Sequence, residues 1–318
     1  MIQQINETIA AEVLILGFES LTNYKVPLFL FLLMIYTLTC LENILIIFLV
    51  FKNHHLHTPM YFLISNLLFC EMTFSTAMVP SMLHFVLPGK GVIYYLDCVV
   101  QICIMGVVTM VEIFLLTLMS YDRYLAICQP LRYPALMHNT LCLHFIIGFW
   151  LISLVINVIM FYLLISLEFC SSLRTDYFFC DFTALLSTAC IVSDVKPLIR
   201  LGLVTSILFN LPFGLIVLSY SLIIFAILRM SSASGQQKAF STCSSHLLVV
   251  SIYFIVPFSS NVVFYTGDSY KWSSIVYYLV PPVVNPIIYT LRNQEVHKAL
   301  QITLNDVKQH VIIKMPSK

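Results

Sequence analysis

The chain has 318 residues, of which 60% are hydrophobic and only 10% are charged, and its mean hydropathy is +0.94. A soluble globular domain usually carries about 25% charged residues, so this composition excludes an ordinary water-solvated domain and predicts a protein surrounded mostly by lipid. The net charge of +1 says nothing about partners, and the lack of a basic run predicts no nucleic-acid partner.

Seven apolar stretches follow one another along the chain, and each is long enough to cross a bilayer, which takes about 20 residues. They cover residues 27–51, 58–86, 97–125, 140–165, 197–228, 239–264 and 272–291. Inside a bilayer every backbone polar group needs a partner within the protein, so such runs predict helices. A transmembrane β-barrel would show short alternating strands instead. The sequence therefore predicts an all-α membrane protein, a seven-helix transmembrane bundle.

The placement of Lys and Arg predicts how the bundle is oriented. Ten of the 16 Lys and Arg residues fall on the side that also holds the C-terminal tail. Because cytoplasmic loops are enriched in these residues, we expect residues 1–24 to be extracellular, residues 25–292 to form the transmembrane domain, and residues 293–318 to be cytoplasmic. The first 24 residues are too polar for a signal peptide. The sequon at Asn6 would then lie outside, where glycosylation takes place.

Four cysteines lie at or beyond the predicted outer ends of spans, in an oxidising compartment: Cys98, Cys170, Cys180 and Cys190. Four cysteines allow three pairings. A Cys98–Cys180 bond would tie the third span to the long second outer loop, and a Cys170–Cys190 bond would then close that loop on itself. Zinc is the alternative, but the spacings are not those of C-x-x-C sites, so we expect disulfides.

The third stretch ends in Asp122-Arg123-Tyr124, which places a permanent cation at the end of a bilayer-spanning helix. Such a charge is costly and is usually functional. The alternative interpretation is an interfacial arginine that reaches to the lipid headgroups.

After residue 292 the chain turns polar and then amphipathic. Val296, Ala299, Leu300 and Leu304 share one face at helical spacing. This pattern predicts a short amphipathic eighth helix on the inner leaflet, with membrane lipid as its partner.

Five sequence strings together resemble one receptor family. They are LHTPMYF at 56–62, MSYDRYLAIC at 119–128, SY at 219–220, KAFSTCSSHL at 238–247 and PVVNPIIYTLRN at 282–293. From about Leu16 to Leu304 the chain resembles the olfactory (odorant) receptors, which are rhodopsin-like G-protein-coupled receptors. It departs from the family pattern at Glu42-Asn43, at Glu71, and at Tyr253-Phe254-Ile255.

The resemblance implies an activation switch at the inner end of the bundle. In the resting state Arg123 would pair with Asp122, and activation would release it toward Tyr220 and Tyr289. The residues that the resemblance assigns to this switch are Asp122, Arg123, Tyr124, Tyr220, Asn285, Pro286 and Tyr289.

The resemblance also implies an ion or proton site between the second, third and seventh spans. Its members would be Asn43, Glu71, Glu112 and Asn285. A lone buried carboxylate prefers to be neutral, whereas two close together can share a proton or hold a cation. Sodium is the one metal considered, and the alternative is a pair of protonated, hydrogen-bonded acids with no ion.

By family position, a ligand pocket lies in the outer half of the bundle beneath the second outer loop. The expected lining residues are Met105, Gly106, Thr109 and Met110 in the third span, Val204, Ile207 and Leu208 in the fifth, Phe254, Pro257, Asn261 and Tyr265 in the sixth, and Tyr278 in the seventh. Amine receptors carry an acid where this chain has Met105, and the seventh span contains no lysine for a retinal Schiff base. We therefore expect a small, neutral, lipophilic ligand.

Together these features predict an odorant receptor of the plasma membrane that binds volatile ligands and activates a heterotrimeric G protein. The resemblance implies a stimulatory, olfactory-type G protein that raises cyclic AMP. A receptor of the same family for a metabolite outside the nose is the nearest alternative. An ion-coupled transporter or channel would explain the buried acids, but it predicts repeated halves that are not visible. No enzyme motif such as H-E-x-x-H or G-x-S-x-G occurs, so we expect no enzymatic activity.

Overall fold

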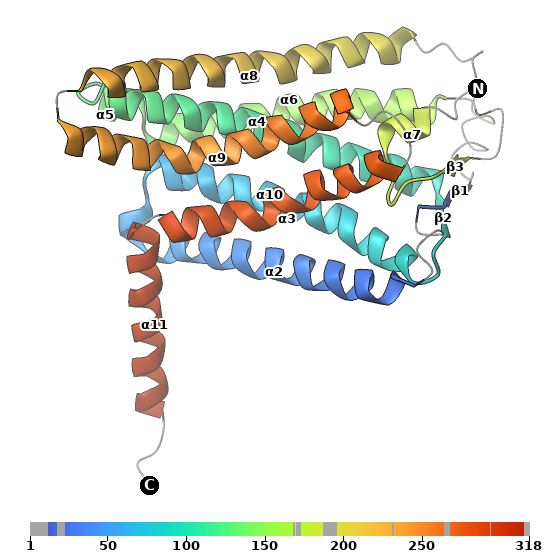
Figure 1. Cartoon of the computed structure of the whole chain (residues 1–318), viewed down its shortest axis with the longest axis horizontal. Helices are drawn as coiled ribbons and strands as arrows, with labels where there is room; N and C mark the ends of the chain where they lie inside the picture. Colours follow the sequence, from blue (N-terminus) through green and yellow to red (C-terminus); the bar gives the residue numbers. More distant parts are fainter. Residues whose placement is uncertain are drawn as a thin grey trace.

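The computed structural model of the chain describes residues 12–17, 23–167, 169, 173–186, 196–230, 232–263, 268–292 and 294–314. Seven long helices in these residues lie side by side (Figure 1). They are α2 (Lys25–Lys52), α3 (Pro59–Val86), α4 (Tyr95–Cys128), α6 (Asn139–Ile165), α8 (Lys196–Arg229), α9 (Ala233–Val263) and α10 (Asp268–Arg292). Each predicted span coincides with one of them, so the prediction of a seven-helix bundle is confirmed.

The helices α3 and α4 form the centre of the bundle. In the most apolar segment of each, 61% of the residues are buried, compared with 17% in α6. The outer helices instead expose large apolar side chains, such as Leu41, Val155 and Ile207. Among the described residues, α2, α3, α4, α6 and α8 are long and apolar enough to cross a membrane. Lipid is therefore the solvent of the outer faces.

A small sheet at one end of the bundle departs from the all-α expectation. The strand β1 (Glu12–Ile15) pairs antiparallel with β2 (Gly91–Tyr94) and parallel with β3 (Arg174–Thr175). It buries Val13 and Ile15, which stabilises the strand by removing apolar surface from water. We call this end of the bundle the sheet end, and the opposite end, where α4 finishes, the Arg123 end.

A disulfide joins Cys98, in the first turn of α4, to Cys180 in the loop that follows β3. Gln101 supports it: its side chain donates to the Ala77 carbonyl at 2.7 Å and accepts from the Cys180 backbone N–H at 3.1 Å. The loop continues into α7 (Phe182–Leu186). Cys170 and Cys190, which were expected to form the second bond, and Asn6, the expected glycosylation site, lie outside the described residues.

Short elements complete the Arg123 end. They are η1 (His54–Leu56), α5 (Tyr133–Leu136) and α11 (Gln294–Lys314). In Figure 1 α11 runs across the direction of the bundle, as an interfacial helix would. Val296 and Ala299 of the predicted apolar face are buried, whereas Leu304 is half exposed. At 21 residues the helix is also longer than the sequence predicted.

Candidate functional site

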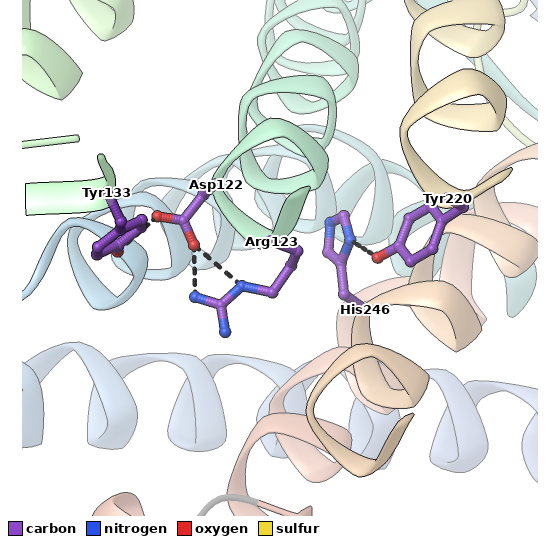
Figure 2. A network of polar contacts seen from close by, with 5 residues as sticks. All are labelled: Asp122, Arg123, Tyr133, Tyr220 and His246. Atoms are coloured by element: carbon purple, nitrogen blue, oxygen red, sulfur yellow. Dashed lines mark hydrogen bonds and ion pairs between the residues drawn. The ribbon is translucent and has the colours of Figure 1, made fainter. Parts of the chain in front are cut away.

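An arginine network closes the Arg123 end of the bundle (Figure 2). The guanidinium of Arg123 bonds Asp122 Oδ2 through Nε at 2.9 Å and also through Nη2. Asp122 is fully buried, and a buried carboxylate requires such partners. The structure thus brings together the two charged members of the predicted switch in their paired state.

Tyr133 holds the other oxygen of this carboxylate. Its hydroxyl donates to Asp122 Oδ1 at 2.9 Å from the first residue of α5. Partial burial, and next the Asp122 charge, raise the pKa of Tyr133 above its ordinary value, so the phenol stays protonated and able to donate. Sequence reasoning missed this residue because it lies beyond the motif, in a loop whose path the sequence does not specify.

A second hydrogen-bonded pair lies on the other side of Arg123 in Figure 2. The Tyr220 hydroxyl of α8 bonds His246 Nδ1 of α9, and both residues are buried. Tyr220 was predicted as a switch residue that bonds Arg123 on activation. In this structure its hydroxyl is bonded to His246 instead. Sequence reasoning missed His246, although the residue belongs to the KAFSTCSSHL string.

Three more predicted switch residues are Tyr124, Pro286 and Tyr289. Tyr124 accepts a hydrogen bond from Gln129 at 3.2 Å. Tyr289, buried in α10, has a hydroxyl without a hydrogen-bond partner among the described residues, and it lies within electrostatic reach of Tyr220 and Arg123. Pro286 lies inside α10, one turn before Tyr289. An unpaired buried hydroxyl is costly. A movement of the helices that gave the Tyr289 hydroxyl a hydrogen-bond partner would therefore be favourable.

The buried acids meet at mid-bundle. Glu71 of α3 accepts hydrogen bonds from Asn285 and, at 3.1 Å, from the Tyr253 hydroxyl, both to Oε1. Glu112 of α4 is also buried, and the same tyrosine interacts with it. Asn43 instead donates to the carbonyls of Thr39 and Pro282, at 2.7 and 3.1 Å. All four predicted polar residues are therefore buried in the core formed by α2, α3, α4 and α10.

Three oxygen atoms of this cluster have no hydrogen-bond partner among the described residues: Asn43 Oδ1, Glu71 Oε2 and Asn285 Oδ1. A cavity of about 20 Å³ lies in the same core, lined in part by Glu112 and Tyr253 but not by these three residues. That volume exceeds the roughly 10–15 Å³ that one water needs. The cavity has room for one water, and the three unpaired oxygens are of the kind that a small hard cation prefers.

A larger cavity of about 380 Å³ opens toward the sheet end, next to the Cys98–Cys180 disulfide. Five of the predicted ligand-binding residues line it: Met105, Gly106, Thr109, Met110 and Tyr278. The Tyr278 ring stacks on Phe74 with centroids 5.4 Å apart and meets the edge of Phe179 at 5.3 Å. The volume lies within the range of about 300–1,000 Å³ usual for small-ligand pockets.

The contribution of α8 to this cavity differs from the prediction. Val204 and Ile207 are 48% and 64% exposed on the outer face of the helix, and Gly202, Thr205 and Phe209 line the cavity instead. Successive helix positions lie about 100° apart. A prediction that is wrong by one position therefore turns the chosen side chain from the cavity side of the helix toward the lipid side. In lipid both faces are apolar, and periodicity therefore does not reveal which one points inward.

Other predicted residues lie beside the cavity or outside the described residues. Leu208 packs against the small apolar cluster formed by Met110, Ile156 and Leu201, and Phe254 packs on Phe213 with centroids 4.7 Å apart. The side chains of Pro257, Asn261 and Tyr265 lie outside the described residues. Asn157 of α6 lines the cavity and was missed by sequence reasoning.

A seven-helix membrane bundle, with an Asp-Arg pair at one end and a ligand-sized cavity toward the other, is the architecture of a G-protein-coupled receptor. The fold is similar to the crystal structure of squid rhodopsin, with a TM-score of 0.69 over 86% of this chain and 79% of that chain, at 20% sequence identity.

Comparison of the sequence with protein families and characterised relatives identifies the family. The olfactory receptor family profile matches residues 32–306. The chain is 39% identical over 307 residues to human olfactory receptor 10A7, covering 94% of this chain and 95% of that receptor. It is 41% identical over 300 residues to human olfactory receptor 6N1, covering 93% and 96%. The chain belongs to the olfactory receptor family; it is a multi-pass membrane receptor and not an enzyme.

Proposed function

We propose that the protein is an odorant receptor that binds small, neutral, lipophilic volatiles in the cavity at the sheet end. The cavity walls support this proposal because they are mainly aromatic and aliphatic, and among the described lining residues there is no Lys or Arg. An apolar wall favours ligands whose binding removes apolar surface from water. Methionines such as Met105, Met110 and Met160 adapt their shape, which suits recognition of several related ligands.

The single observation that carries the proposal is the helix α4, which serves both ends of the molecule. Met105, Gly106, Thr109 and Met110 line the cavity, and Arg123 lies 13 residues beyond Met110 on the same helix. At 1.5 Å per residue this separation is about 20 Å. A ligand that favours one arrangement of helices around α4 can thereby bias the pairing of Arg123.

In this proposal the sheet end and the N-terminus are extracellular, and the Arg123 end and the C-terminal tail are cytoplasmic, in the plasma membrane. Activation releases Arg123 from Asp122 toward Tyr220 and Tyr289. The opened face, which includes Pro130, Arg132 and the start of α9 near Lys238, engages a stimulatory, olfactory-type G protein that raises cyclic AMP.

The test is to measure cyclic AMP in cells that express the full chain, tagged at its N-terminus for surface staining, across a panel of neutral volatiles. The same cells without the stimulatory G-protein α-subunit are the control. A rise that needs both the volatile and the α-subunit supports the proposal. A receptor present at the surface that responds to no member of the panel would contradict the choice of ligand class or of G protein.

We expect Tyr133→Phe to raise basal cyclic AMP by roughly threefold to tenfold, because it removes a hydrogen bond to a charged carboxylate that is worth about 1.5–3 kcal/mol at most. Without this bond the paired state of Asp122 and Arg123 is less stable relative to the released state. Tyr121→Phe is the matched control, since Tyr121 is 43% exposed on the same helix as Asp122. A basal signal in Y133F that equals or falls below that of the parent would show that Tyr133 does not restrain the switch.

We further propose that sodium binds among the unpaired oxygens of Asn43, Glu71 and Asn285. At equal ionic strength, sodium chloride should then raise the unfolding temperature of the purified receptor by about 2–4 °C over choline chloride, which corresponds to roughly 1 kcal/mol. Glu71→Gln removes the charge that attracts the ion, so the difference should vanish. Glu42→Gln, which changes another acid of the bundle, should keep it. Equal unfolding temperatures of the parent in the two salts would favour protonated acids without an ion.

A further inference from the structure

The polar groups in the wall of the sheet-end cavity are mostly hydrogen-bond acceptors. Thr109 of α4 and Thr205 of α8 both line the cavity. The Thr109 hydroxyl donates to the Met105 carbonyl at 2.8 Å, and the Thr205 hydroxyl donates to the Gly202 carbonyl at 3.0 Å. A hydroxyl has one hydrogen and two lone pairs. Both threonines therefore offer a ligand only their lone pairs.

Asn157 contributes a third acceptor from α6. Its Nδ2 donates to the Ser153 carbonyl at 2.9 Å, which fixes the orientation of the amide. Its Oδ1 then lies against Gly106 of α4, so closely that a Cβ atom at position 106 would overlap it. Gly106 is thus the residue that leaves room for the Asn157 side chain at the cavity wall.

The loop above the cavity adds no backbone donor at Cys180. The N–H of Cys180 is already bonded to Gln101 Oε1 at 3.1 Å. The next residue, Asp181, also lines the cavity. The acceptors of the cavity wall therefore come from three helices, α4, α6 and α8.

From this arrangement we infer that the cavity selects neutral ligands that carry a hydroxyl group, namely alcohols and phenols. This inference rests on the proposed function and names the ligand class of the same site. A ligand hydroxyl can donate to the wall acceptors and can accept from the second N–H of Asn157. A ketone or an ether can only accept, and it leaves the acceptors unpaired in an apolar enclosure, which is unfavourable.

A protonated amine also donates, but the mainly apolar wall does not suit it. Phe74, Ile102 and Met160 form part of the lining, and an ammonium group loses far more hydration free energy than a hydroxyl does on entering such a site. Tyr278 also lines the cavity, and its ring packs on Phe74 and Phe179. The preference for alcohols is therefore expected from Asn157 and the threonines, not from Tyr278.

The test compares ligands of matched shape: octanol, octanal, methyl octyl ether and octylamine, and the ring series menthol, menthone and menthyl methyl ether. Two readouts are used on the full chain, namely cyclic AMP in cells and the unfolding temperature of the detergent-solubilised receptor with each compound. Binding to the folded state raises the unfolding temperature without any G protein. We expect the alcohols to act at about tenfold lower concentration than the aldehyde, the ketone or the ethers. A factor of about ten is the affinity that one additional hydrogen bond contributes.

Substitutions in the cavity wall test which residues cause the preference for alcohols. Asn157→Leu should abolish the advantage of the alcohols, and Gly106→Ala, which pushes against Asn157 Oδ1, should reduce it. Tyr278→Phe keeps the ring that stacks on Phe74 and should leave the preference for alcohols unchanged. Asn210→Leu is the matched control: Asn210 also donates to the carbonyl four residues earlier, Ser206, at 2.7 Å, but it lies exposed on α8. It should leave the preference unchanged.

The two readouts separate the inference from the function on which it rests. Alcohols that stabilise the receptor without raising cyclic AMP would support the inference and contradict the proposed coupling. Equal stabilisation by alcohols, ethers and ketones would overturn the inference and leave the receptor function intact. The inference is also overturned if octylamine acts best, if no compound stabilises the receptor, or if N157L keeps the full preference for alcohols.

Discussion

Arg123→Ala should reduce the ligand-induced rise in cyclic AMP by roughly 10- to 100-fold at equal surface level. The guanidinium makes the charged hydrogen bonds of the resting state, and in the proposed mechanism it makes new ones when it is released. Each hydrogen bond to a charged group is worth about 1.5–3 kcal/mol, and 1.4 kcal/mol is a factor of ten. The measurement is a full concentration–response curve for an alcohol to which the parent responds, with surface staining of every variant.

The same substitution leaves the buried carboxylate of Asp122 without its charge partner, and breaking a buried pair in this way costs about 3–5 kcal/mol. The double variant Asp122→Asn with Arg123→Ala removes the stranded charge. It should recover surface level but not signalling. Arg229→Ala is the matched control, because Arg229 lies over the Phe225 ring at 4.0 Å on the outer side of α8. A double variant that signals as the parent does would show that Arg123 has only a structural role.

Cys98→Ser or Cys180→Ser should cause the largest loss of stability. The bond joins residues separated by 82 positions, and the chain-entropy model assigns such a closed loop about 4.5 kcal/mol at 25 °C. Ordinary folding free energies are about 5–15 kcal/mol, so little stability would remain. We expect a severe loss of surface receptor and an unfolding temperature lowered by about 10 °C in the fraction that can be purified.

Both single variants and the double variant should lose a similar amount, because each removes the same bond. Cys142→Ser and Cys70→Ser are the controls, because both thiols are free and buried in the bundle. A Cys98→Ser receptor that reaches the surface at the parent level, with an unchanged unfolding temperature, would show that the loop over the cavity is held by its other contacts, such as those of Gln101.

Much of the ligand cavity and of the Arg123 network could be predicted from the sequence. Local strings place Asp122 and Arg123 at the end of α4, and α4 residues from Met105 to Met110 could be assigned to the cavity by resemblance to the family. What the sequence could not predict is contact between distant segments. Tyr133 bonds Asp122 across a loop, and His246 bonds Tyr220 between two helices. The strand β1 forms because it pairs with two segments that lie about 80 and 160 residues further along the chain. Local sequence patterns do not reveal such distant partners.

The sequence by itself determined the seven long helices, their approximate limits and the burial of Glu71 and Glu112. The physical reason is that lipid requires long uninterrupted apolar runs and penalises each charge within them. Only the tertiary structure decided how each helix is rotated about its axis. It turned Thr205 and Phe209 of α8 toward the cavity, in place of Val204 and Ile207, and it set Asn157 against Gly106. In water an apolar face marks the inside of a helix, whereas in lipid the inside and the outside are equally apolar, so packing against neighbouring helices is what sets the rotation.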